Sequence, residues 1–123
     1  MTTIKSFSDL EQSRKLEEIL PLESADMWWS RCTITDFGDG ALKVSYAVEP
    51  CNISQFRNTN EDIPCWSLAA LLSVLPKIHG AKPILDLEEN SIQYTGIDLY
   101  VVADNSVDAC VNMIIKLHEL NLL

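Results

Sequence analysis

Cys65 is the residue whose type and position come closest to suggesting chemistry, since it precedes an apolar run in the stretch NEDIPCWSLAALLSVLP. A nucleophilic cysteine needs a lowered pKa, which a histidine or a helix N-terminus can supply. Folding would have to bring His79 or His118 to the thiol. Ser67 is the predicted helix N-cap, so Cys65 lies outside the first helical turn. The sequence therefore favours a buried structural cysteine beside Trp66 over a nucleophile.

The remaining titratable residues match no established catalytic or metal-binding spacing. The chain contains no C-x-x-C, H-x-x-x-H or H-E-x-x-H motif, no phosphate-binding glycine loop and no G-x-S-x-G elbow. Asp86 and Glu88 share one face of a predicted strand, which leaves a glycosidase-type pair open. Charges at such positions also protect sheet edges. We therefore expect no cofactor and no metal, and we favour a protein that is not an enzyme.

Composition indicates one soluble globular domain over residues 1–123, because 47% of the residues are hydrophobic and 22% are charged. The net charge is −9, from 18 acidic and 9 basic residues. The basic residues are scattered along the chain, and the overall field repels phosphate. We therefore expect no direct binding to nucleic acid.

The N-terminal stretch MTTIKSFSDLEQ has no continuous apolar segment, so it does not resemble a signal peptide. No apolar stretch reaches the roughly 18 residues that a membrane span needs. The four cysteines stand at positions 32, 51, 65 and 110, with no sign of a secreted disulfide framework. These features predict a cytoplasmic protein with reduced thiols and no membrane association.

The first half of the chain predicts a helix, a hairpin and a second helix. Ser8 could cap a helix that ends at Leu20, with Glu11 at the capping-box spacing. Residues 27–37 and 41–48 read as strands joined by the GDG turn at positions 38–40. Residues 50–63 are polar and irregular, either as a binding loop or as a surface excursion. Leucines at helical spacing follow Ser67 as far as Pro76.

The second half predicts a meander and a long helix. Residues 84–103 alternate in two or three short strands, and Asn105 can cap a helix from Ser106 to about Leu120 with Asp108 at its third position. The order is α-β-β-α-β-β-(β)-α. Strands joined by short turns pair antiparallel. We expect an α+β fold with about three helices on one face of an antiparallel sheet of four to five strands.

Trp28, Trp29 and Met113 are the candidate interface residues. Neighbours in a strand point to opposite faces, so one of the two tryptophans looks away from the core unless the first helix or the polar loop covers it. Outward aromatic side chains are common in binding hot spots. The last helix is apolar over a wide face, which Met113 extends. That face needs cover from the sheet or from a second subunit, so a homodimer is plausible.

Three stretches carry a resemblance to a known group of proteins: ESADMWW, IPCWSLAALLSVLP and DACVNMIIKLHELNLL. Together they resemble a group of small proteins without an assigned activity that phages and mobile elements of gut bacteria carry. The shared positions are mostly apolar helix positions, so the resemblance implies a common fold and transfers no catalytic residue. It also implies a cytoplasmic bacterial protein of accessory genomic origin.

Three functional hypotheses follow. The leading one is a module that binds another protein or itself, without catalysis. The second is an acidic decoy that occupies the nucleic-acid-binding surface of a defence or host protein, because the net charge is −9. The third is a small enzyme that uses Cys65, or an aspartate or glutamate, together with His79 or His118.

Overall fold

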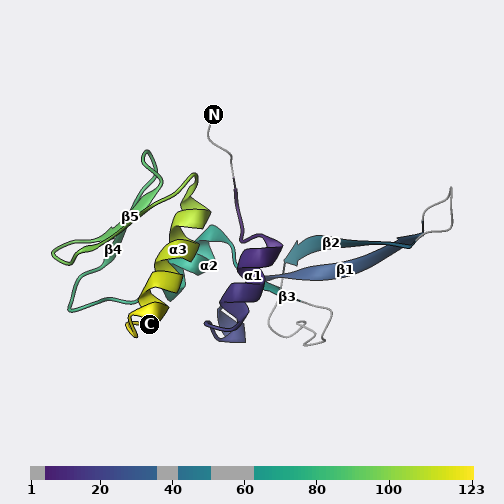
Figure 1. The fold of residues 1–123 in the computed structure, drawn as a ribbon, viewed down its shortest axis with the longest axis horizontal. Coiled ribbons are helices and arrows are strands. Elements are labelled where there is room, and N and C mark those ends of the chain that lie inside the picture. Colours follow the sequence, from purple (N-terminus) through teal and green to yellow (C-terminus); the bar gives the residue numbers. More distant parts are fainter. Residues whose placement is uncertain (1–4, 36–41, 51–62) are drawn as a thin grey trace.

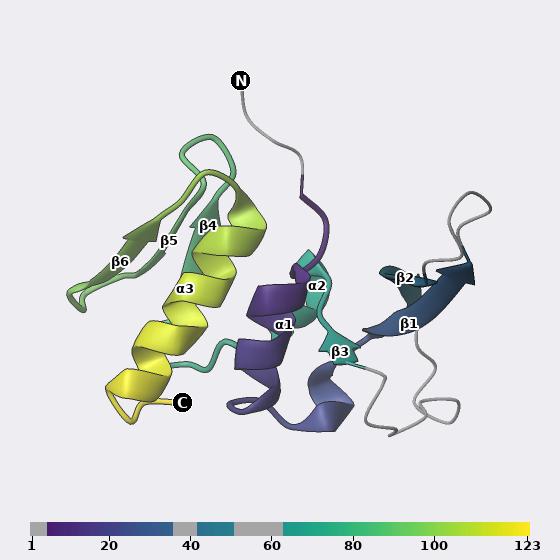
Figure 2. The same cartoon turned by 45° about the vertical axis from the view of Figure 1, so that its right-hand side comes forward.

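The computed structural model describes residues 5–35, 42–50 and 63–123, and within them the chain is α+β, as predicted. Three α-helices lie between two small antiparallel sheets, which stand at opposite ends of the molecule (Figures 1 and 2). The predicted GDG turn and residues 51–62 of the predicted irregular segment lie outside the described residues.

The first sheet contains β1 (Met27–Thr35), β2 (Leu42–Pro50) and β3 (Ile63–Cys65) in the order β2-β1-β3. β1 and β2 form the predicted hairpin, paired from Met27 opposite Pro50 to Thr35 opposite Leu42. β3 was not predicted. It has only three residues, too few to show alternation, and it forms by pairing with the first three residues of β1.

The second sheet is the predicted meander, with β4 (Pro83–Asp86), β5 (Ser91–Tyr94) and β6 (Leu99–Val102) in chain order. Each adjacent pair is antiparallel. The predicted single sheet of four to five strands is therefore wrong, since the strands divide into two sheets of three. The helices lie between the two sheets (Figure 2).

The helices are α1 (Leu10–Glu17), α2 (Leu68–Val74) and α3 (Ser106–Glu119), with a 3-10 turn η1 at Leu22–Ser24. The predicted caps of α2 and α3 are confirmed, because the side chains of Ser67 and Asn105 accept N–H bonds from the first turn of each helix.

The predicted cap of α1 is wrong by one residue. Asp9 accepts the N–H of Gln12 at 2.8 Å, and the Gln12 side chain accepts the N–H of Asp9 at 3.0 Å. This reciprocal pair is a capping box, with glutamine in the place of glutamate. Ser8 is buried one residue earlier and bonds elsewhere.

The core forms around α3. One side of this helix contacts β5 and β6, and another side contacts α2 and α1. Seven of its residues are buried, which settles how its wide apolar face is covered: the rest of the chain covers it. The buried residues are Val107, Ala109, Cys110, Val111, Met113, Ile114 and Leu117. Leu120, where the helix was predicted to end, caps the helix and is half exposed.

The burial of Met113 generates a first prediction. Met113→Ala should lower the free energy of unfolding by about 2–5 kcal/mol, because it leaves a cavity in a close-packed core. Its exposed neighbour provides the matched control: Asn112→Ala should change stability by no more than about 0.5 kcal/mol. Urea unfolding followed by circular dichroism measures both variants. Equal stability of the two would place Met113 outside the core.

Candidate interaction surface

Cys65, the leading catalytic candidate, is the last residue of β3 and is completely buried. Its thiol donates to the backbone oxygen of Ser8 at 3.4 Å and lies 3.6 Å from the Ser8 hydroxyl. The N-terminal segment reaches this position because Ser8 N–H donates to the Trp66 carbonyl at 2.9 Å. The thiol therefore faces backbone and hydroxyl groups inside the protein.

The polar groups around Cys65 satisfy one another. The hydroxyls of Ser8 and Ser13 lie 2.7 Å apart, and Trp66 N–H donates to the Ser8 hydroxyl at 3.1 Å. The Trp29 indole N–H donates to the Ser13 hydroxyl at 3.1 Å. A buried network whose members all have partners holds elements in register. This cluster thus joins β1, β3 and α1.

Burial raises the pKa of the Cys65 thiol above its ordinary value of 9.0, although the hydrogen bonds from Ser8 and Ser13 oppose the shift. Burial also raises the pKa of Cys110 to about 12. A nucleophilic cysteine needs the opposite shift. His79 and His118 are both exposed. The structure therefore places Cys65 in the core, which is the location that the sequence favoured.

The structure also accounts for Asp86 and Glu88, the possible glycosidase-type pair. Asp86 ends β4, and its carboxylate accepts N–H bonds from Glu88 at 2.9 Å and from Glu89 at 3.2 Å. It therefore closes the turn into β5, in the manner typical of aspartate in turns. Glu88 lies in that turn and not on the strand face that it was predicted to share. Within residues 5–35, 42–50 and 63–123, no cluster of side chains has the composition of a metal site.

A second polar cluster joins the N-terminal segment to the start of α3. Lys5 Nζ lies 2.7 Å from Asp108 Oδ1 and 2.9 Å from Asp9 Oδ2. Gln12 Nε2 and Asn105 Nδ2 also donate to the Asp108 carboxylate, at 2.8 and 2.9 Å. Burial alone would raise the pKa of Asp108, but these hydrogen bonds, led by that of Lys5, hold the pKa below its ordinary value of 3.8. The cluster is a clamp between α1 and α3.

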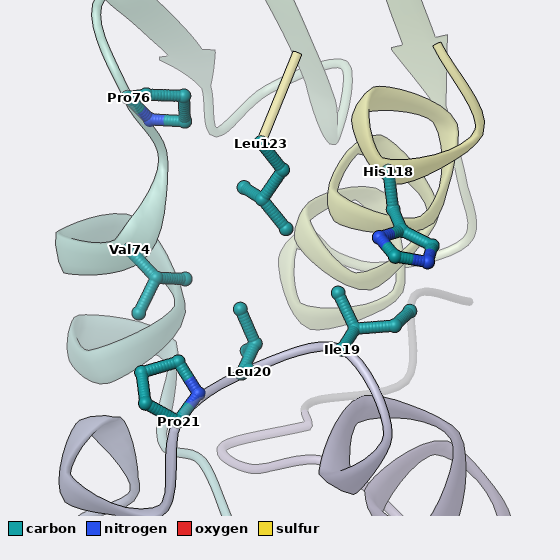
Figure 3. A pocket seen from close by; sticks show the side chains of 7 residues that line it. All are labelled: Ile19, Leu20, Pro21, Val74, Pro76, His118 and Leu123. Carbon is teal, nitrogen blue, oxygen red and sulfur yellow. The ribbon is translucent and has the colours of Figure 1, made fainter. Parts of the chain in front are cut away.

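An apolar cleft of about 540 Å³ opens where the ends of α1, α2 and α3 meet (Figure 3). Leu20 and Leu123 point into it from opposite sides, and His118 is the one side chain in its lining that carries a polar group. The rest of the lining is aliphatic or proline. A single imidazole over such a surface provides neither a nucleophile nor an acid–base pair. The complete lining is Ile19, Leu20, Pro21, Val74, Pro76, His118 and Leu123.

The three predicted interface residues do not come together on one surface. Met113 is completely buried in the core, so it offers no contact to a partner in this structure. The Trp29 ring packs edge-on against Phe7, 5.8 Å between centroids, and donates to Ser8 and Ser13, so the first helix and the segment before it cover this side chain. Trp28 is half-buried on the opposite face of the strand.

The clearest exposed apolar surface lies on the second sheet, away from α3. Ile84 pairs with Gln93, and Gln93 pairs with Tyr100, so the three side chains form a row across the sheet. Val102 lies beside this row, two residues after Tyr100. The exposed fractions are 48% for Ile84, 48% for Tyr100 and 53% for Val102. We call Ile84, Gln93, Tyr100 and Val102 the outer sheet face.

Sequence reasoning missed the outer sheet face, although a signal was present. Leu99 and Val101 face inward, with one buried and one half-buried side chain. The alternate residues Tyr100 and Val102 are also apolar, so β6 is apolar on both faces. A strand with only one covered face normally alternates apolar and polar residues. The departure at β6 points to a second surface that is suited to contact.

Exposed carboxylates surround the outer sheet face. Asp98 and Asp104 flank β6, while Asp86 ends β4 and Glu88 and Glu89 occupy the turn that follows it. The Tyr100 hydroxyl donates to Glu89 at 3.2 Å, so one carboxylate reaches the apolar row directly. Lys82 supplies a basic group immediately before β4. The surface is therefore an apolar centre with a mainly acidic border.

Comparison of the chain with protein-family models, with curated proteins and with solved structures found no match. The resemblance to proteins of phages and mobile elements thus stays a prediction. No helix in the described parts of the chain has the length and apolarity to cross a membrane.

The Cys65 environment predicts slow thiol chemistry. Iodoacetamide at pH 8 should alkylate Cys65 and Cys110 at least about 100-fold more slowly in the native protein than in urea, because both thiols are buried and protonated. Peptide mapping by mass spectrometry resolves the rate at each site. Rapid native labelling of Cys65 would show an accessible thiolate and restore the nucleophile hypothesis.

The Lys5–Asp108 clamp predicts a pH-dependent stability. The depressed pKa of Asp108 contributes stability that is present above its unfolded value near 3.8 and is lost as the pH falls through the native value. Asp108→Asn should therefore lower the free energy of unfolding at pH 7 by about 1–2 kcal/mol. The difference from wild type should begin to shrink as the pH falls below 3.8, and it should disappear once the pH is below the depressed native pKa of Asp108.

Urea unfolding at pH 7, 5, 4 and 3 measures this difference. The control is Asp98→Asn, which removes an exposed carboxylate from the turn before β6. It should follow the wild type at every pH. A constant deficit for Asp108→Asn across the whole series would assign the loss to helix capping and not to the ionised clamp.

Proposed function

We propose that this protein is a non-catalytic binding module, and that the outer sheet face docks another protein. The observation that carries the proposal is the row of Ile84, Gln93 and Tyr100 with Val102 beside it, whose apolar members are about half exposed. Exposed apolar surface that a polar rim surrounds is characteristic of interaction sites. Tyrosine is also among the residues enriched at interface hot spots.

The partner that fits this surface has an apolar patch with Lys or Arg around it. Asp86, Asp98 and Asp104 border the face, and the whole chain carries a net charge of −9. Complementary charge accelerates encounter and disfavours partners of like charge. A second copy would bring the same acidic border against itself, so we favour a different protein over a homodimer.

A cytoplasmic location belongs to the same proposal. Cys65 and Cys110 are free thiols, which is the usual state in a reducing compartment. An accessory protein of a phage or mobile element, as the resemblance implies, would act there by binding a protein of its host. Such binding requires no covalent reaction at the buried Cys65.

The test uses a photo-reactive phenylalanine analogue at position 100 in the full chain, expressed in the native host. The control carries the analogue at position 11, an exposed position on α1. We expect a cross-linked protein that depends on position 100, which mass spectrometry identifies and which is then purified for titration. No product at position 100, or the same product from position 11, overturns the proposal.

Titration of the purified partner then assigns the contact. Ile84→Ser with Tyr100→Ser should weaken binding at least about tenfold by calorimetry, because both changes remove apolar contact from the centre of the face. Leu22→Ser is the matched control, since Leu22 is similarly exposed on η1. Equal losses of affinity in the double variant and in Leu22→Ser would mean that the outer sheet face is not the docking surface.

A further inference from the structure

β6 is an edge strand with hydrogen-bonding groups that point outward. In the described part of the chain it has β5 as its only strand neighbour. Ala103 N–H donates to the Asn90 carbonyl at 3.1 Å, and bonded pairs alternate along an antiparallel ladder. The backbone groups of Val101, paired with Ile92, therefore face β5 as well, while Leu99 N–H donates to the Ile97 carbonyl at 2.8 Å in the turn before the strand. The backbone groups of Tyr100 and Val102 face away from the sheet.

The opposite edge of the same sheet differs. Along β5, Ser91 and Gln93 must bond to β4, opposite Asp86 and Ile84. The outward positions of β4 are thus Pro83 and Leu85. Proline has no N–H, so this edge lacks one of its donors, which is a common way of protecting a sheet edge.

β6 is short, with four residues, but it lacks the residue types that usually protect an edge. Its sequence is LYVV, without proline, lysine or an inward-pointing charge, and both outward-facing residues are exposed. Figure 2 shows β6 at the outer side of its sheet, away from α1 and α2. The strand that carries the unprotected edge also contributes Tyr100 and Val102 to the outer sheet face. One binding partner can therefore use both.

Charge defines what could pair with this edge. Asp98 immediately precedes β6 and Asp104 follows it by two residues, so two exposed carboxylates flank the strand about 20 Å apart. A second copy paired antiparallel, with Tyr100 opposite Val102, would place Asp98 of each copy opposite Asp104 of the other. Like charges directly opposite are destabilising. Basic residues at the same positions are favourable.

We propose that β6 binds an extended segment of a partner protein as a fourth strand, and that this segment carries Lys or Arg on both sides of a short β-branched or aromatic run. The proposal rests on the proposed function and specifies how the partner docks. The outward N–H and C=O groups of Tyr100 and Val102 bond the segment backbone, and Asp98 and Asp104 bind its basic ends.

The test is a selection from a random decapeptide library displayed on phage against the full-length protein. Selected peptides should carry basic residues about six positions apart around an apolar β-forming centre, as the spacing of Asp98 and Asp104 requires. Their affinities are then measured by fluorescence anisotropy. The absence of selected peptides, or selection of peptides without basic flanks, overturns the proposal.

Val102→Pro is the sharpest variant, because it removes an outward N–H while leaving the bonds to β5 intact. Val102→Thr is its matched control, with a similar shape and the N–H retained. Val102→Pro should weaken the affinity for the selected peptides about tenfold, and Val102→Thr should weaken it by less than about twofold. Circular dichroism and thermal unfolding verify that both variants fold. Equal affinity of the two overturns the proposal.

Asp98→Asn with Asp104→Asn provides a second test that leaves the strand unchanged. This double variant should weaken the affinity for the same peptides about threefold to tenfold, and it should flatten the salt dependence of binding. Unchanged affinity and salt dependence overturn the charge assignment. A wild-type dimer in sedimentation that Val102→Pro dissociates would identify a second copy as the occupant and overturn the proposed partner.

The outcomes separate this inference from the proposed function. The double variant Ile84→Ser with Tyr100→Ser could weaken binding of the cross-linked partner while Val102→Pro leaves that binding unchanged. The partner would then lie on the outer sheet face without adding a strand. Strand addition is then wrong and the docking surface stands. If neither variant weakens binding of the partner, both proposals fail.

Discussion

The burial of α3 is the constraint on which the rest of the structure depends. The helix is apolar around most of its circumference, so no single neighbour can cover it. The β4–β6 sheet covers one side, and α2 and α1 cover another. All three helices consequently lie on the same side of that sheet (Figures 1 and 2). Nothing among the described elements remains to cover the outer sheet face.

The polar clusters around Cys65 and Lys5 hold this arrangement together. Both draw on the segment before α1: Ser8 bonds to the backbone of Trp66, and Lys5 reaches Asp108 at the start of α3. Each cluster joins residues that are far apart in the sequence. Polar groups satisfied in this way contribute modestly to net stability, yet leaving one without its partner is costly. They therefore specify how the helices meet, and they account for the side chains that most resembled a catalytic site.

The outer sheet face and the β6 edge are two consequences of one small sheet. A three-stranded sheet with helices on one side leaves an open face, and each of its outer strands leaves an open edge. At β4, Pro83 removes an outward donor. At β6, apolar residues occupy both the face and the edge. The proposed docking of a partner rests on these two exposed apolar features.

Local patterns predicted most of the elements. The caps at Ser67 and Asn105, the β1–β2 hairpin, the meander and the structural role of Cys65 all follow from signals within a few residues. Two local features escaped prediction. β3 is too short to alternate, and the cap of α1 lies at Asp9, next to a serine that is equally suitable by type.

The residues by themselves determined an α+β chain with an acidic surface and an apolar last helix, because composition, capping and alternation act over short distances. The tertiary structure decided that the strands form two sheets, that Met113 is buried and that Tyr100 and Val102 are exposed. An apolar pattern shows that a side chain can be buried, but it does not show which face another element will cover. That choice depends on contacts between distant parts of the chain, which here were settled by the packing of α3.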